Sequence, residues 1–204
     1  DELKINESDT AGIAEAVALA KKSAVVIMVL GEHGMQSGEG RSRSRLDLPG
    51  LQQQMLEAVY KVNKNIVLVL MNGRPLTITW AAENVAAILE AWQPGMQSGD
   101  AIAQILFGEY NPSGKLPITF PRSVGQVPIY YNHYNTGRPG PKKEVFWSHY
   151  TDESNKPLYP FGFGLSYTKF EYGKLKIDDV NKAMIKVSVT VKNTGNYTGE
   201  EVVQ

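Results

Sequence analysis

Three short apolar runs constrain the fold of this chain more than any other feature. They are AVVIMVL at residues 24–30, NIVLVLM at residues 65–71 and AAILEAW at residues 86–92. None of them alternates between apolar and polar positions, as a strand with one solvent-facing side would. Each run is therefore typical of a strand that is buried on both faces, and such strands occur almost only in parallel sheets covered by helices.

Helical patterns separate and follow these runs. Residues 8–22 and 51–62 carry apolar side chains at helical spacing, and DAIAQILFG, which begins at Asp100, has Gly108 in the usual C-terminal position. This order predicts an α/β domain with a mostly parallel sheet flanked by helices. In such a domain, ligands bind in the loops beyond the carboxyl ends of the strands.

The character of the chain changes beyond Tyr110. Residues 111–167 are rich in Pro, Gly and Tyr and show little periodicity, which is typical of irregular loop. The later segment MIKVSVTVKN alternates strictly and predicts one half-buried antiparallel strand, with Ile185, Val187, Val189 and Val191 on its inner face. We expect an N-terminally incomplete α/β domain, an irregular linker and a truncated β-sandwich segment, at residues 1–131, 132–166 and 167–204.

Charge and composition exclude several kinds of partner. The 204 residues include 21 basic and 21 acidic side chains, so no net positive charge favours nucleic acid or an anionic membrane. No apolar run approaches the roughly 20 residues that a membrane-spanning helix needs. The chain has no cysteine, and His33 has no second His or Cys at ligand spacing, so we expect neither a metal nor a cofactor.

The segment GEHGMQSGEGRSRSRLDLPG, at residues 31–50, holds the candidate reacting groups. It contains two candidate acids, Glu32 and Glu39, and three arginines at alternate positions, which could hold an acid ionised or bind substrate oxygens. A solvated loop with surface charges is the alternative interpretation. Glu32 directly follows a strand, which favours a role in orienting the loop. The glycines match neither the dinucleotide-binding pattern nor the P-loop pattern, so nucleotide binding is disfavoured.

The pentapeptide GMQSG occurs twice, at residues 34–38 and 95–99, and an acid follows each copy. The second acid, Asp100, opens a helical pattern, and a carboxylate there meets the positive end of the helix dipole. That structural role is sufficient for Asp100, whereas Glu39 lies inside a long glycine-rich loop. Because the surroundings differ, we expect no internal repeat with two equivalent sites.

Several longer segments together resemble glycoside hydrolase family 3. They are GEGRSRSRLDLPG, VLMNGRPL, AWQPGMQSGDAIAQILFGEYNPSGKLPITFPRSVGQVPIYYNHYNTGRP and LYPFGFGLSYTKF, and VSVTVKNTGNYTGEEVVQ is similar to the start of the family's fibronectin type III-like domain. The resemblance implies a retaining β-glucosidase of several domains. In this family a TIM-like barrel supplies an Asp nucleophile, and the following α/β sandwich domain supplies the general acid/base Glu. The resemblance also implies that the barrel is missing from this chain.

The family pattern assigns roles to particular residues. The acid lies ten residues before the proline of LDLP, which is Glu39, and the arginine four residues after it, Arg43, is implied to contact substrate. Trp92 could form part of an aromatic wall against a sugar face, although packing between side chains is the alternative. Asn72 and Arg74, in a turn at the ligand end of the sheet, are expected to fix loop geometry or to dock onto the barrel. Without the barrel, we expect the chain alone to be inactive.

Two other functions stay open at this point. One is a β-xylosidase of the same family, since barrel residues largely decide which sugar is bound. The other is a non-catalytic carbohydrate-binding or interdomain module. The resemblance implies a periplasmic or secreted protein whose partners are a β-glucoside or oligosaccharide and the missing barrel domain, with no nucleic acid, membrane or metal.

Overall fold

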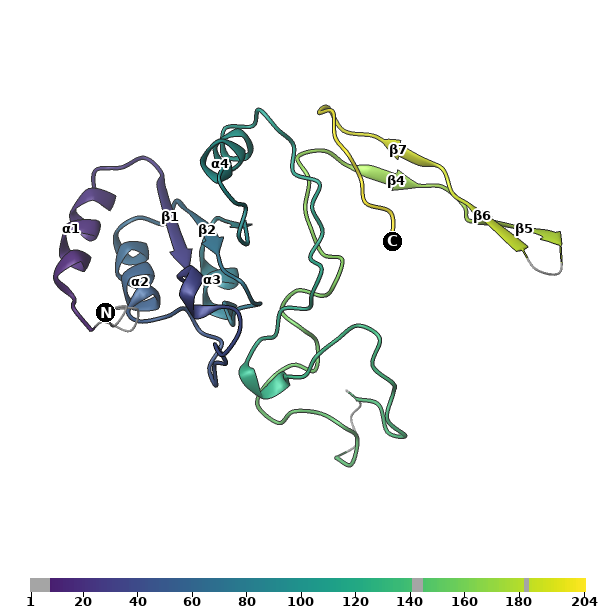
Figure 1. Cartoon of the computed structure of the whole chain (residues 1–204), viewed down its shortest axis with the longest axis horizontal. Coiled ribbons are helices and arrows are strands. Elements are labelled where there is room, and N and C mark those ends of the chain that lie inside the picture. Colours follow the sequence, from purple (N-terminus) through teal and green to yellow (C-terminus); the bar gives the residue numbers. More distant parts are fainter. Residues whose placement is uncertain (1–7, 141–144, 182–183) are drawn as a thin grey trace. The chain divides into compact units, whose positions relative to one another are not determined.

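The computed structural model describes residues 8–140, 145–181 and 184–204. These residues form two compact units, which we describe separately. The first extends to Ser98 and includes Ile118–Phe161, and the second comprises Gly99–Pro117 and Gly162–Gln204. The predicted architecture is confirmed, because a parallel sheet with helices is followed by antiparallel strands (Figure 1).

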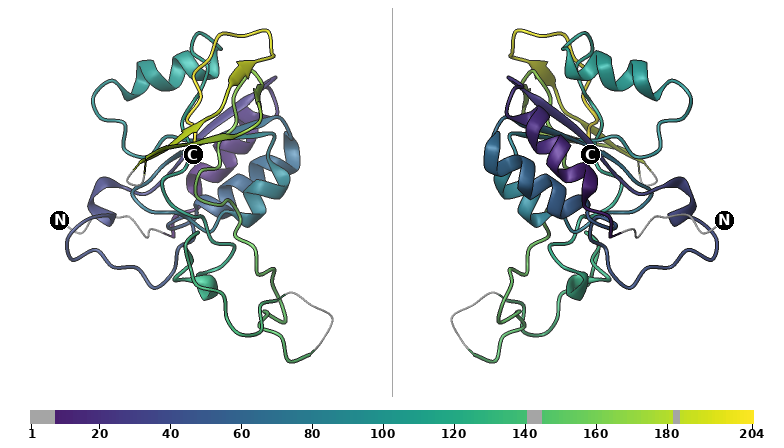
Figure 2. Two further views of the ribbon diagram at one scale, coloured as in Figure 1. Left: turned by 90° about the vertical axis from the view of Figure 1, so that its right-hand side faces the viewer. Right: turned by 90° about the vertical axis from the view of Figure 1, so that its left-hand side faces the viewer.

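Parallel strands and helices form the first unit (Figures 1 and 2). Its described residues include three strands and three α-helices. The strands lie in the order β1-β2-β3, so β2 is central. Helix α2 packs against α1 and contacts β1. The strands are β1 (Val26–Gly31), β2 (Ile66–Met71) and β3 (Ala87–Glu90), and the helices are α1 (Ala11–Ala20), α2 (Gln52–Val62) and α3 (Thr79–Asn84).

The core of the first unit surrounds β2. Ile66, Leu68, Val69 and Leu70 are completely buried on this strand, so the prediction of a strand buried on both faces holds for β2. It is wrong for β1, where Ile27 and Val29 remain 46% and 56% exposed. The reason is that β1 forms an edge of the described sheet, and α2 meets only one of its faces.

Short and irregular parts of the first unit are less evident in the sequence. Helix α3 was not predicted, because its six residues are too few to show a helical period. Its first residue, Thr79, donates a hydrogen bond from its hydroxyl to the carbonyl oxygen of Arg122 at 2.9 Å. Beyond the short 3-10 helix η2 (Val124–Gln126), the chain runs to Phe161 without a helix or named strand among its described residues, as expected for its composition.

The second unit contains two antiparallel ladders and nearly all of α4 (Ser98–Leu106). Strand β4 (Phe170–Tyr172) pairs with β7 (Val191–Asn193), and β5 (Lys176–Asn181) pairs with β6 (Met184–Ser188). The single strand predicted from MIKVSVTVKN is therefore wrong, since β6 and β7 each pair with a different partner. Ile185 and Val187 are 65% and 59% exposed rather than half-buried, because each ladder has only two strands.

Candidate functional site

The loop of residues 31–50 leaves the carboxyl end of β1 and returns to α2, so it lies at the predicted ligand edge of the sheet. Its first residue, Gly31, has a φ of 142°, and a Cβ there would lie 2.0 Å from the carbonyl oxygen of Met71. Glycine is required because the end of β1 passes close to the backbone of β2. The next amide, of Glu32, donates to the Met71 carbonyl oxygen at 2.9 Å.

Glu32 is a buried carboxylate bound by two arginines. Its side chain has no exposed surface, and its Oε1 lies 2.7 Å from Arg43 Nη1 and 2.9 Å from Arg74 Nε. Its Oε2 accepts a hydrogen bond from the backbone amide of Gly73 at 3.2 Å. This agrees with the orienting role expected for Glu32, since a carboxylate enclosed in this way cannot reach a ligand.

Both arginines also bind backbone carbonyls of the same loop. Arg43 donates from Nη2 to the carbonyl oxygen of Asp47 at 2.7 Å. Arg74 donates from Nη2 to the carbonyl oxygen of Gln36 and to that of Arg41, the latter at 3.0 Å. The arginine of the β2–α3 turn therefore fixes the geometry of the neighbouring loop, which was one of the two roles expected for it.

In the sequence, Glu39 lies between Gln36 and Arg41, the two residues whose carbonyl oxygens Arg74 binds, and it is exposed. It is flanked by Gly38 and Gly40, whose φ angles of 118° and 68° favour glycine. Within the residues that the structure describes, its side chain makes no hydrogen bond and no ion pair. The carboxylate of Glu39 is therefore accessible to a ligand, whereas that of Glu32 is not.

His33 has a structural role at the start of the same loop. It caps the 3-10 helix η1 (Gly34–Gln36), with its Nδ1 accepting from the amide of Met35 at 3.2 Å. In the described part of the chain, no group of three or more His, Cys, Asp or Glu side chains is arranged to hold a metal ion. No helix in that part is long and apolar enough to cross a membrane.

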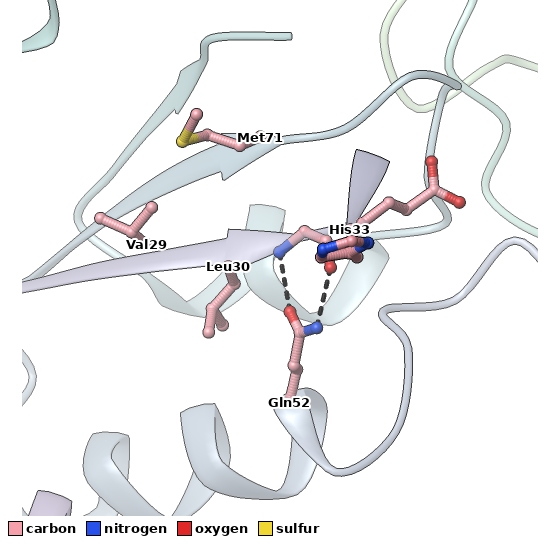
Figure 3. A pocket seen from close by; sticks show the side chains of 7 residues that line it. Val29, Leu30, His33, Gln52 and Met71 are labelled. Carbon is pink, nitrogen blue, oxygen red and sulfur yellow. Dashed lines mark hydrogen bonds between the residues drawn. The ribbon is translucent and has the colours of Figure 1, made fainter. Parts of the chain in front are cut away.

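An open pocket of about 380 Å³ lies beside the end of β1 (Figure 3), and Glu39 is not among the residues that line it. Gln52, from the start of α2, closes one side of it by pairing with the backbone of Gly31. Its Oε1 accepts from the Gly31 amide at 2.7 Å, and its Nε2 donates to the Gly31 carbonyl oxygen at 2.8 Å. These two bonds satisfy the backbone groups at the end of an edge strand.

The three loops at this edge of the sheet converge at Gly73. A Cβ at Gly73 would lie 2.1 Å from Ser37 Oγ and 3.2 Å from Gln93 Nε2. Ser37 belongs to the loop that carries Glu39, and Gln93 follows Trp92 in the loop after β3. The first copy of GMQSG is thus packed against a neighbouring turn.

The second copy of GMQSG has different surroundings. It leads into α4, and Asp100 lies in the exposed first turn of that helix. A carboxylate at this place interacts favourably with the positive end of the helix dipole. The expectation of two unlike sites is therefore supported.

Trp92 is half-buried and has a φ of 53°, which is unusual for a residue with a side chain. Its ring packs on Phe120 with 5.7 Å between the ring centroids. Its amide donates to Oε1 of Glu90 at 3.1 Å, and this bond supports the unusual backbone conformation. The packing role considered for Trp92 is therefore present.

Glu90 was not recognised as a special residue in the sequence. Burial raises the pKa of its carboxyl group to about 7, although hydrogen bonds from the Trp92 amide and the Asn72 side chain lower it. Asn72 Nδ2 donates to the carbonyl oxygen of Arg74 at 2.9 Å, while Asn72 Oδ1 is buried without a partner among the described residues. The sequence did contain a signal for this environment, because Glu90 is an acid within the otherwise apolar run of residues 86–92.

The chain is similar to a well-defined group of known proteins. The sequence profile of the glycosyl hydrolase family 3 C-terminal domain matches residues 2–167. A periplasmic beta-glucosidase of Salmonella typhimurium is 48% identical over 202 residues, which are 97% of this chain and 26% of that protein. A beta-xylosidase of Formosa agariphila is 46% identical over 200 residues, covering 95% of this chain and 26% of that protein.

The same similarity extends to solved structures. The crystal structure of beta-glucosidase from Listeria innocua in complex with glucose matches with a TM-score of 0.89 at 39% identity. The match covers 96% of this chain and 28% of that one. The present chain thus spans about a quarter of the length of the curated relatives it matches.

Proposed function

Because the chain belongs to glycoside hydrolase family 3 through the family's C-terminal domain, we propose that its loop of residues 31–50 supplies the general acid/base of a retaining β-glucosidase. The proposed catalytic residue is Glu39. The activity belongs to a longer protein that also contains a barrel domain with the nucleophile. Localisation in the periplasm or outside the cell is part of this proposal and rests on similarity to the periplasmic beta-glucosidase of Salmonella typhimurium.

One observation carries the proposal: of the two candidate acids in the loop, one is enclosed and the other is accessible. The carboxylate of Glu32 is bound by Arg43 and Arg74 at the base of the loop, whereas Glu39 is exposed between two glycines. A proton donor has to approach the glycosidic oxygen closely, and flanking glycines leave room for that approach. Glu39 therefore meets the geometric requirement that Glu32 fails.

The chemistry needs two carboxyl groups. In the first step, Glu39 gives its proton to the glycosidic oxygen as the bond to the anomeric carbon breaks and the nucleophile bonds to that carbon. In the second step, the Glu39 carboxylate takes a proton from the water that releases the sugar. The nucleophile has to lie about 5–5.5 Å away across the scissile bond. Glu32 cannot take that role, since its carboxylate is buried between two arginines.

Arg43 and Trp92 remain the proposed substrate contacts. Trp92 is half-buried and its ring packs on Phe120, and an aromatic ring that keeps some exposure suits the apolar face of a sugar. The guanidinium of Arg43 already binds Glu32 and the Asp47 carbonyl oxygen. Its contact with substrate is therefore the weaker of the two proposals.

The proposed requirement for a second carboxylate predicts that residues 1–204 alone do not hydrolyse an aryl β-glucoside faster than buffer. The same residues joined to the barrel domain should give turnover. The measurement is release of nitrophenol from a nitrophenyl β-glucoside, with the Glu39→Gln form of the short chain as the matched blank. Turnover by the short chain that disappears in this blank would show that no second domain is needed.

The alternatives give different results in the same assay. The beta-xylosidase relative is nearly as similar to the chain as the beta-glucosidase relative, so identity does not separate these two substrates. A comparison of kcat/KM for nitrophenyl β-glucoside and β-xyloside in the longer protein separates them. A non-catalytic module would bind sugar in calorimetry, and substitution of Glu39 would not change turnover in the longer protein.

A further inference from the structure

The turn around Glu39 is bound from outside the loop by the guanidinium of Arg74. Arg74, in the turn after β2, donates from Nη2 to the carbonyl oxygens of Gln36 and Arg41. These two carbonyls lie on either side of Glu39 in the sequence. The contacts join the two limbs of the turn at its base, although that turn contains two glycines with positive φ angles and would otherwise be flexible.

Arg74 is itself fixed by a buried anion. Its Nε lies 2.9 Å from Oε1 of Glu32, whose side chain has no exposed surface, while 19% of the Arg74 side chain is exposed. The Gly73 amide binds the other oxygen of Glu32 at 3.2 Å, so the turn and the carboxylate are joined at two points. The planar guanidinium can bind the carboxylate through Nε and the two carbonyls through Nη2, a geometry that a lysine ammonium cannot reproduce.

We propose that Glu32 and Arg74 are positioning residues for Glu39: the Glu32–Arg74 pair clamps the Gln36 and Arg41 carbonyls and thereby sets where the Glu39 carboxyl group lies. This inference rests on the proposed function of Glu39. Proton transfer requires that the carboxyl group approach the glycosidic oxygen to hydrogen-bond distance. An error of about 1 Å in the position of a catalytic group can cost about 10²-fold in rate.

The chain contains a matched comparison for the clamp. Arg43 binds the same Glu32 oxygen, at 2.7 Å, and its side chain is also 19% exposed. Its second contact, however, is the Asp47 carbonyl oxygen, which does not lie within the turn around Glu39. Arg43→Lys and Arg74→Lys therefore each replace one guanidinium partner of Glu32 by an ammonium group of the same charge. Only Arg74→Lys also removes the contacts to the Gln36 and Arg41 carbonyls.

The first experiment observes the loop directly by amide hydrogen exchange in NMR spectra of the chain. The reporter is the Arg41 amide, which donates to the Gly38 carbonyl oxygen at 3.2 Å inside the turn. Arg74→Lys should increase the exchange rate of this amide at least about tenfold, whereas Arg43→Lys should change it less than about threefold. Equal exchange rates in Arg74→Lys and the unchanged protein, or equal increases in both variants, would overturn the clamp.

The second experiment measures the rate effect in the longer protein that contains the barrel. Arg74→Lys and Glu32→Gln should lower kcat about tenfold to a hundredfold for alkyl β-glucosides, with KM changed less than about threefold. The loss should be small for a dinitrophenyl β-glucoside, whose leaving group needs little protonation. A merely structural role would reduce the amount of folded enzyme and lower both rates by the same factor, and that result would overturn the positioning role.

The failure of this inference can be told apart from failure of the proposed function. If Glu39→Gln shows the leaving-group dependence but Arg74→Lys and Glu32→Gln do not, Glu39 is the acid and the clamp does not position it. If Glu39→Gln itself leaves both substrates unaffected, the proposed function fails, and the positioning inference fails with it.

Discussion

Replacement of Glu39 by Gln is expected to lower kcat for alkyl β-glucosides about 10²–10⁴-fold in the protein that joins this domain to its barrel. The amide keeps the size of the side chain and cannot donate a proton to the leaving oxygen. Because Glu39 is exposed and its side chain makes no hydrogen bond or ion pair within the described residues, the variant should fold normally. The measurement is kcat on a series of glucosides with leaving groups of increasing acidity.

The loss should shrink as the leaving group becomes more acidic, since a dinitrophenolate departs without protonation. For such substrates the second step limits the rate, and added azide should restore turnover by replacing the activated water. Asp100→Asn is the matched control, because Asp100 follows the other copy of GMQSG and lies in the first turn of α4. It should leave kcat within about twofold. Equal losses across the leaving-group series would contradict the acid role of Glu39.

The sequence predicts the parts of the fold that depend on local patterns. The apolar run that became β2 lies at the centre of the described sheet, and four of its side chains are completely buried, so its lack of alternation carried the correct information. The similar run that became β1 lies at an edge of the described sheet, which periodicity alone cannot show. Alternation in MIKVSVTVKN identified strand conformation but not the break between β6 and β7, since that break follows from pairing with different strands.

In the candidate site, too, the features that depend on neighbouring residues could be predicted, and those that depend on contacts between distant residues could not. The position of Glu39 in a glycine-rich loop and the structural role of Glu32 could be inferred from neighbouring residues. The clamp could not, because Arg74 is far along the chain from the carbonyls it binds and its partners are backbone atoms without a sequence signature. The special environment of Glu90 also depends on burial by distant side chains, and it leads to a prediction of its own.

Glu90→Gln is expected to remove a pH dependence from the stability of the first unit. The pKa of the Glu90 carboxyl group is raised from 4.5 to about 7, mainly by burial, so the folded state binds the proton more tightly than the unfolded state. The stability that Glu90 contributes is therefore fully present below about pH 4.5 and is lost as the pH rises through 7. The pKa difference corresponds to about 3–4 kcal/mol in total, of which about 2–3 kcal/mol is lost between pH 5 and 8.5.

The charged groups of the adjacent turn do not obscure this effect. Arg74 and Glu32 pair with each other, and the contacts to Glu90 come from the Trp92 amide and the Asn72 side chain. A glutamine copies the protonated carboxyl group, since its Oε1 can still accept from the Trp92 amide. It stays neutral at every pH, so the variant avoids the cost of burying a charge above pH 7.

The measurement is urea unfolding of both proteins between pH 5 and 8.5. The free energies of unfolding should be similar at pH 5, and the Gln variant should become more stable by about 2–3 kcal/mol at pH 8.5. Glu83→Gln, at an exposed acid on α3, is the matched control and should show no such divergence. A constant difference between Glu90→Gln and the unchanged protein across this range would mean that Glu90 is ionised in the folded state throughout. The buried carboxyl would then have to be stabilised by a donor beyond Trp92 and Asn72.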